Sequence, residues 1–294
     1  MKHKNIRFKG FPDLLQQISQ PPQALYVWGE IPAAPAVAVV GSRQPTSYGA
    51  QVTHALASEL ARAGVVIVSG LAYGVDTIAH RAALEVGGKT IAVLGGGLDR
   101  IYPRSNQELA EQISQNGAVI SEYVPDAAPL PFHFPQRNRI IAGLSLGVIV
   151  TEANAKSGSL ISASYALEQN RIVMAVPGNI TSLRSAGPNF LLKMGAAPVT
   201  SALDVLDLLN IEPAASQTTA STSHKLSDLQ QAILSAIEAG HSSTAAISES
   251  TKQPITKLTI ALSGLEIAGM IRQLQTGEWA IVSPERVANM ALKL

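Results

Sequence analysis

Short apolar runs alternate with longer segments of helical period between residues 36 and 210 of this 294-residue chain. The runs are almost wholly apolar rather than alternating, which is typical of strands covered on both faces of a parallel sheet. They occupy residues 36–40, 65–69, 90–94, 118–121, 147–151 and 171–176. After the first run, an apolar stripe at helical spacing ends at Gly64, a residue that suits a helix C-terminus. The pattern predicts a doubly wound α/β domain over residues 36–210, with a mainly parallel sheet.

The residues on either side of this domain follow different patterns. Residues 1–35 are interpreted as an N-terminal extension and connecting segment. Residues 211–225 are rich in Ser, Thr, Ala and Pro without any period, which predicts a linker. Residues 226–294 predict helices at 226–238, 244–248 and 254–268, followed by two strands around Thr276-Gly277. Three helices and a small hairpin are the arrangement of a winged helix-turn-helix.

Composition indicates a globular chain and removes several function classes. Charged residues make up only 15% of the chain and the net charge is +1, so no global field marks a nucleic-acid or membrane binder. The absence of cysteine excludes disulfides, Cys-ligated zinc and thiol nucleophiles. No run reaches about 18 consecutive apolar residues, so we expect a soluble cytoplasmic protein without a membrane partner.

Basic and acidic residues nearly balance within each predicted domain. Residues 36–210 carry 12 basic and 12 acidic residues, whereas residues 211–294 carry 6 and 7. Duplex binding by the acidic winged-helix segment would need phosphate contacts from its few cations, because such contacts dominate DNA affinity. A protein-interaction or oligomerisation module fits this segment at least as well. Any anionic ligand of the sheet domain must be held locally.

The first candidate site follows the first predicted strand. In open α/β sheets, ligands bind outside the carboxyl ends of the strands, where a helix N-terminus offers N–H groups to an anion. Gly41 permits close backbone approach, Ser42 and Ser47 supply hydroxyls, and Arg43 can grip a phosphate. The alternative is a tight turn with a helix cap and a surface arginine. The segment lacks the G-x-G-x-x-G of dinucleotide binders.

A second candidate site combines rings and guanidinium groups in residues 132–140. Bases stack on aromatic side chains while cations follow the phosphates, so Phe134, with Arg137, Asn138 and Arg139, favours single-stranded nucleic acid as the ligand. The alternative is that Phe134 belongs to the core and that an arginine pairs with Glu122 or Glu152.

A third candidate follows the fifth predicted strand. Ser157, Gly158 and Ser159 can open a helix as an anion site, with Lys156 as its cation. Catalytic patterns are lacking in the sequence: the six histidines have no metal spacing, and neither a Ser/His/Asp arrangement nor a Walker A lysine motif is present. The loops therefore predict binding rather than catalysis, with no cofactor and no metal.

Seven ordered segments resemble one known family. They are VVGSRQPTSYG, SGLAYGVDTIAH, AVLGGGLDRIYPRSN, ISEY, FPQRNRIIAGLS, KSGSLISA and AVPG. In this order they are similar to the DNA-processing protein A (DprA/Smf) family. The resemblance extends from about Phe11 through the sheet domain and, more loosely, to the winged helix. It implies a Rossmann-like domain that binds single-stranded DNA, forms a homodimer and helps to load the RecA recombinase during natural transformation, without catalytic turnover.

The resemblance also implies roles for two residues. The arginine of the family's G-S-R loop lies in a basic pocket on the DNA backbone, which corresponds to Arg43, and an aromatic residue before R-N-R contacts a base, which corresponds to Phe134. Some members carry a lysine shortly before that aromatic, where this chain has residues 129–131, Pro-Leu-Pro. Many relatives also carry a helical SAM-like domain before the sheet, whereas residues before Ala36 resemble only the connecting segment.

Two other classes compete with this interpretation. A lysine-decarboxylase-like (LOG) enzyme shares the sheet and cleaves nucleoside monophosphates, but it requires P-G-G-x-G-T-x-x-E, and residues 156–163 contain no glutamate. A nucleotide-sensing regulator that reads DNA through the winged helix fits the domain order, although the acidic balance of that segment argues against it.

Overall fold

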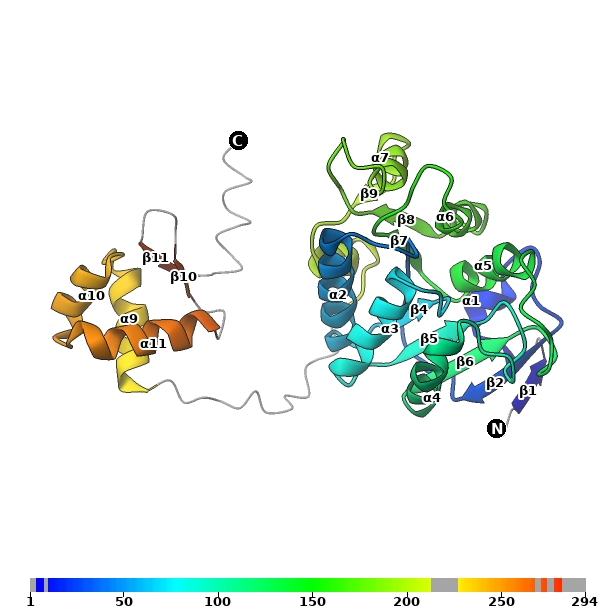
Figure 1. Ribbon diagram of the computed structural model, residues 1–294, viewed down its shortest axis with the longest axis horizontal. Helices are drawn as coiled ribbons and strands as arrows, with labels where there is room; N and C mark the ends of the chain where they lie inside the picture. The colour runs from blue at the N-terminus through cyan, green and yellow to red at the C-terminus, as the bar shows by residue number, and fades with distance from the viewer. Residues whose placement is uncertain (1–3, 8–9, 213–226, 268–270, 274–277, 282–294) are drawn as a thin grey trace. The chain divides into compact units, whose positions relative to one another are not determined.

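The computed structural model describes residues 4–7, 10–212, 227–267, 271–273 and 278–281. The chain divides into two compact units, Met1–Gln217 and Thr218–Leu294 (Figure 1). Most of the predicted linker, from residue 213 onward, lies outside the described residues. Among the described residues, no helix has the length and apolar character needed to cross a membrane.

The first unit is organised around one sheet, which has nine strands among the described residues. The strands are β1 (Lys4–Arg7), β2 (Ala24–Gly29), β3 (Ala36–Val40), β4 (Val66–Ser69), β5 (Thr90–Val93), β6 (Gly117–Ser121), β7 (Gly147–Val150), β8 (Ile172–Ala175) and β9 (Ala197–Pro198). Their order is β1-β2-β6-β5-β4-β3-β7-β8-β9. All neighbours from β6 to β9 are parallel. The chain therefore reverses its direction of winding between β3 and β7.

The six apolar runs predicted as strands are confirmed as β3 to β8, with ends that differ by no more than one residue. The prediction for residues 1–35 was wrong in one respect. β2 pairs antiparallel with β6, and β1 pairs antiparallel with β2, so this segment extends the sheet rather than only leading into it. β9, which pairs with β8 over two residues, was not predicted either.

Helices cover both faces of the sheet (Figure 1). Along β3, Ala36, Ala38 and Val40 belong to one core cluster, while Val37 and Val39 belong to another. The first cluster includes residues of α1 (Asp13–Gln16), α5 (His133–Gly143) and α6 (Ser159–Glu168); the second includes residues of α2 (Ser47–Arg62), α3 (Val75–Glu85) and α8 (Ala202–Leu208). α4 (Gln107–Gln115) packs in a third cluster with β5 and β6, and α7 (Ala186–Lys193) follows β8. This two-sided burial explains the nearly continuous apolar runs.

Specific residues in the sequence explain where α2 begins and ends. The Thr46 side chain accepts a hydrogen bond from the backbone N–H of Gly49, which makes Thr46 the N-cap. At the other end, Gly64 has a φ of +87°, a left-handed conformation that favours glycine, and its N–H donates to the Ala61 carbonyl. Gly64 therefore ends the helix as predicted.

The second unit has the predicted winged-helix elements. Helices α9 (Asp228–Glu238), α10 (Thr244–Thr251) and α11 (Ile255–Ile267) precede an antiparallel pair, β10 (Ile271–Gln273) and β11 (Trp279–Ile281). Ile233, Leu258 and Leu262 form its core with Trp279, whose indole N–H donates to the Thr244 hydroxyl at 3.0 Å. The hairpin is thus fixed to the helices. Thr276-Gly277, the predicted turn, lies outside the described residues.

Candidate nucleic-acid interface

A cleft of about 710 Å³ opens at the carboxyl ends of the parallel strands. Its walls come from the loops after strands β3 to β8 and from the first turns of α5 and α6. β3 and β7 are neighbours from which the sheet continues in opposite directions, and ligands of open α/β sheets bind at such a switch point. The lining contains most of the predicted site residues, namely Gly41, Ser42, Arg43, Phe134, Arg137, Asn138, Lys156, Ser157, Gly158 and Ser159.

The G-S-R loop lies at the centre of the cleft. A Cβ on Gly41 would lie 2.8 Å from the Glu152 carbonyl oxygen, so the close passage of the two loops requires glycine. The Ser42 N–H donates to that same carbonyl at 2.6 Å, which fixes the loop. Arg43 is exposed, and its Cζ lies 5.6 Å from the centroid of the Phe134 ring. The loop therefore presents a cation beside an aromatic face.

Phe134 is half-buried in the wall of the cleft rather than part of the core. A Cβ on Gly95 would lie 2.9 Å from its ring, so a glycine makes room for the ring at the end of β5. The Tyr102 ring is tilted against it, with 5.7 Å between the centroids and 59° between the planes. Tyr102 is itself 45% exposed. Two rings, one from the first turn of α5 and one from the loop after β5, therefore face the same cleft.

Lys156, Ser157, Gly158 and Ser159 form the opposite wall, at the N-terminus of α6. Lys156 is exposed, and the Ser157 and Ser159 hydroxyls lie 2.8 Å apart. The Asn138 side-chain amide donates to the Gly158 carbonyl at 3.2 Å and so connects α5 to this turn. Asn138 is a positioning residue for the loop, because it is buried.

The structure corrects the expectation that the N-terminus of α2 is open to an external anion. The buried Glu152 carboxylate accepts hydrogen bonds from the Thr46 N–H at 2.8 Å and from the Thr46 hydroxyl at 2.6 Å. An internal carboxylate therefore occupies the position at which a helix N-terminus stabilises negative charge. Ser47, the first residue of α2, is exposed but does not line the cleft.

Arg137 is also placed differently from the prediction, because its guanidinium is part of the buried floor of the cleft. It is 4% exposed, and Nη1 donates to the carbonyls of Gly70, at 2.8 Å, and Val93. Burial lowers the pKa of Arg137 to about 10, although the nearby Asp76 carboxylate favours its charged form. A buried guanidinium held by backbone carbonyls positions the loops after β4 and β5 rather than tracking a phosphate.

Asp76 stabilises the same region. Its carboxylate accepts hydrogen bonds from the N–H groups of Gly70 at 3.1 Å and Ala72 at 3.3 Å. Burial raises the pKa of Asp76, while Arg137 and these donors act in the opposite direction. Asp76 is the one carboxylate among the described residues that line the cleft, and it is 8% exposed. Arg43, Lys156 and Arg184 therefore set the charge of the accessible surface.

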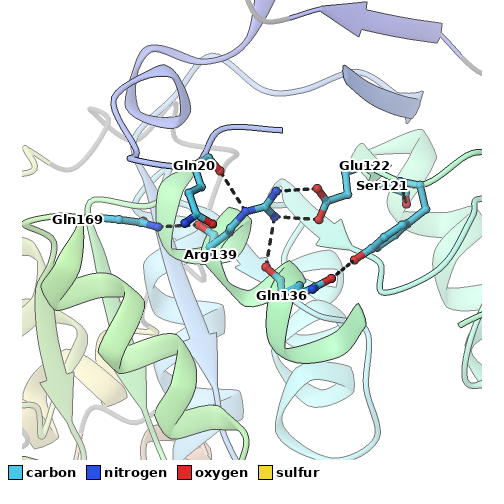
Figure 2. A network of polar contacts seen from close by, with 7 residues as sticks. Gln20, Ser121, Glu122, Gln136, Arg139 and Gln169 are labelled. Atoms are coloured by element: carbon cyan, nitrogen blue, oxygen red, sulfur yellow. Dashed lines mark hydrogen bonds and ion pairs between the residues drawn. The ribbon is translucent and has the colours of Figure 1, made fainter. Parts of the chain in front are cut away.

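Arg139 lies outside the cleft, where Figure 2 shows it at the centre of a polar network. Its Nη1 and Nη2 donate to the two carboxylate oxygens of Glu122 at 2.8 and 2.6 Å, and its Nε donates to the Gln20 carbonyl at 3.0 Å. Both arginines of R-N-R were candidate ligand contacts, with the alternative that one of them pairs with Glu122 or Glu152. The alternative that one of them pairs with Glu122 is correct for Arg139.

Arg184 and Tyr102 are cleft residues with functional side chains that were not assigned to the site from the sequence. Arg184 comes from the loop after β8, and its Nη1 donates to the Ser42 hydroxyl at 3.2 Å. Tyr102 comes from the long loop after β5. The triple glycine at residues 95–97, before Tyr102, is a signal in the sequence that could have pointed to this loop, whereas no motif surrounds Arg184. Among the described residues, no group of His, Asp and Glu side chains could hold a metal ion.

The fold and the site define a class: a Rossmann-like α/β protein with a cationic, aromatic cleft at the switch point of its sheet, followed by a winged helix. The model of the family described as DNA recombination-mediator protein A matches residues 4–210, and that of the DprA winged helix domain matches residues 212–277. The chain belongs to the DNA recombination-mediator protein A (DprA) family.

Several curated relatives carry the same family name. The DNA processing protein DprA of Bacillus subtilis is 44% identical over 207 residues, which cover 69% of this chain and 70% of that protein. The DprA of Streptococcus pneumoniae is 49% identical over 220 residues, or 69% of this chain and 76% of that protein. Protein Smf of Escherichia coli is 48% identical over 202 residues, which span 68% of this chain and 54% of its own length.

Solved structures of the family share the fold. The crystal structure of Streptococcus pneumoniae DprA has a TM-score of 0.67 and 46% identity, covering 70% of this chain and 74% of that one. The Helicobacter pylori DNA processing protein A, whose structure was described for its single-stranded DNA binding mode, has a TM-score of 0.64 and 35% identity. That match covers 71% of this chain and 96% of the other.

Proposed function

We propose that this chain binds single-stranded DNA in the cleft at the switch point of its sheet. The observation that carries the proposal is the combination of Arg43, Lys156 and Arg184 with the Phe134 and Tyr102 rings in one cleft. Cations that follow phosphates and rings that stack on bases are what a single strand requires. The Helicobacter pylori relative, described for its binding of single-stranded DNA, supports the same ligand here.

The contacts divide by chemistry. Arg43 can bind a phosphate through two N–H groups, whereas Lys156 acts as a compact point charge on the opposite wall. Phe134 and Tyr102 offer faces to the bases without selecting a sequence, because every base has a π-face. The buried Arg137 and Asp76 hold the loops in register and make no direct contact with DNA in this proposal.

We further propose that the chain acts as a recombination mediator, which delivers the bound strand to the RecA recombinase during natural transformation. In this proposal it acts in the cytoplasm as a homodimer and without catalytic turnover. The family description as a recombination mediator supports this role. The measurement is RecA filament formation on strands coated with single-strand-binding protein. We expect the chain to accelerate it and the Arg43→Ala variant to do so less.

The DNA-binding proposal is tested by fluorescence anisotropy with labelled oligo(dT), using Arg43→Ala and the matched control Arg62→Ala. Arg62 is exposed in the last turn of α2, outside the cleft. If about three phosphates are contacted, the slope of log K against log[salt] is roughly −2, and loss of Arg43 reduces its magnitude by about 0.7. A second control, Lys257→Ala, alters an exposed cation of the winged-helix unit.

The expected order of affinity places Arg43→Ala well below both control variants. Equal affinity and equal salt slope in Arg43→Ala and Arg62→Ala would remove the cleft as the DNA site. A larger loss in Lys257→Ala than in Arg43→Ala would transfer the binding to the second unit.

A further inference from the structure

Three rings form a column beside the cleft. The His133 imidazole stacks on the Tyr123 ring with 3.9 Å between the centroids and 22° between the planes. The Phe132 ring meets His133 edge to face, at 4.6 Å and 75°. Tyr123 and His133 are half-buried, whereas Phe132 is 57% exposed. The exposed ring is therefore the outer end of an ordered aromatic stack.

Hydrogen bonds hold the column against the ends of β5 and β6. His133 Nδ1 lies 3.2 Å from the Gly95 carbonyl, at the end of β5. The Tyr123 N–H donates to the Ser121 hydroxyl at 3.0 Å, and that hydroxyl donates to the Gly96 carbonyl at 2.7 Å. Gly95 is also the residue on which Phe134 packs. The column and the cleft ring thus share one support, and Phe132 is held in place before any ligand arrives.

The surroundings of Phe132 connect it to the cleft. Pro131, which precedes it, and Phe134, two residues after it, both line the cleft, whereas Phe132 itself lies just outside the lining. The loop after β5 carries the exposed Arg100 and Arg104, and its Gly97 N–H donates to the Ala127 carbonyl in the loop that precedes Phe132, at 2.9 Å. An exposed ring next to the cleft and two exposed cations in an adjoining loop are the kinds of group that the cleft also carries, although these loops include the exposed Asp99 and Asp126 as well.

We propose that Phe132, backed by His133 and Tyr123, is a second base-stacking site, which takes a nucleotide of the strand where it leaves the cleft past Pro131. This inference rests on the proposed binding of single-stranded DNA. A ring already fixed by its neighbours loses little freedom when a base stacks on it, so each contact retains more of its binding energy. The exposed Val124 and Leu130 in the same loop also suit a protein partner, which the experiment separates from DNA.

The experiment compares oligo(dT) of about 4 and about 16 nucleotides, the range of site sizes in compact single-strand-binding domains. Affinities are measured at low salt, which keeps binding of the short strand measurable. We expect Phe132→Leu to lower the affinity for the longer strand by roughly 5-fold or more, since stacking on one ring is worth about 1–3 kcal/mol. The affinity for the shorter strand should not change. Phe132→Trp retains a ring and should bind both strands as the wild type does.

Phe134→Leu provides the matched comparison. The Phe134 ring lies in the cleft, so its loss should lower the affinity for both strands. Equal affinities of Phe132→Leu and wild type for the longer strand would overturn the second site. So would an equal loss for both lengths, or an altered oligomeric state in size-exclusion chromatography without any change in DNA affinity. If the Arg43→Ala and Phe134→Leu variants also bind both strands normally, the proposed function itself fails.

Discussion

The Arg43 guanidinium carbon lies 5.6 Å from the centroid of the Phe134 ring. These side chains come from two segments more than ninety residues apart, the loop after β3 and the first turn of α5. At an exposed site such a cation–π contact is worth about 0.5–1 kcal/mol. It places the guanidinium that we propose as a phosphate contact directly beside the ring that we propose as a base-stacking surface. In the proposed mode of binding, one nucleotide engages both side chains without rearrangement of the loops.

Loss of the aromatic face of Phe134 should weaken single-stranded DNA binding even where another apolar side chain replaces the ring. We expect Phe134→Ala and Phe134→Leu each to lose about 1–3 kcal/mol of binding free energy, whereas Phe134→Trp keeps the affinity near that of the wild type. Isothermal titration calorimetry with oligo(dT) gives the values, and thermal unfolding of each variant serves as the control. Wild-type affinity in Phe134→Leu would show that the ring face makes no contact with a base.

The strands that the sequence predicted are those buried on both faces. In β3 all five residues are buried, and such runs are distinctive. β2 alternates between buried and half-buried residues and lies near prolines at 21, 22 and 32, so its pattern did not separate it from a loop. Its antiparallel pairing with β6 depends on tertiary contact that local periodicity does not encode.

The site was predicted where the chain follows a parallel strand directly, as in Arg43 and Lys156. Arg137 and Arg139 could not be distinguished in the same way. Residues two apart on a helix of 3.6 residues per turn point to nearly opposite sides, so one guanidinium enters the cleft floor and the other faces Glu122. The sequence shows both charges but not the rotation of α5. Arg184 was missed because its loop has no pattern that marks a ligand.

Loss of the Arg139–Glu122 ion pair should reduce stability and leave DNA binding unchanged. The two side chains are only 14% and 17% exposed, and the pair is bidentate, so a single substitution leaves a partly buried charge without its partner. We expect Arg139→Met or Glu122→Gln to lower the free energy of unfolding by about 2 kcal/mol. Urea denaturation measures this loss.

A double-mutant cycle with both substitutions should show less than additive loss, because the second change removes the charge that the first left unpaired. Measured without urea, where all three variants are folded, the affinity for oligo(dT) should equal that of the wild type. A selective decrease in affinity for Arg139→Met with unchanged stability would restore Arg139 as a DNA contact.

His80 should make the protein less stable in mildly acidic solution. Its side chain is fully buried in α3, with Nδ1 2.7 Å from the Thr90 hydroxyl and no hydrogen-bond partner at Nε2. Burial, assisted by the positive charge of Arg137, lowers the pKa of His80 from 6.5 to about 3. The unfolded chain therefore binds a proton below pH 6.5 that the folded chain binds only near pH 3. The free energy of unfolding falls as the pH falls through this window.

The slope attributable to His80 is at most about 1.4 kcal/mol per pH unit, since one proton is involved. Asp76, whose pKa is raised by burial, contributes in the opposite direction above pH 3.8, so the comparison requires a variant that changes His80 alone. His80→Gln retains a donor toward Thr90 without an ionisable group. We expect urea denaturation between about pH 4.5 and 8 to show a steeper loss of stability toward acid for the wild type than for His80→Gln. Parallel pH profiles would show that His80 takes up its proton in the folded protein near its ordinary pKa.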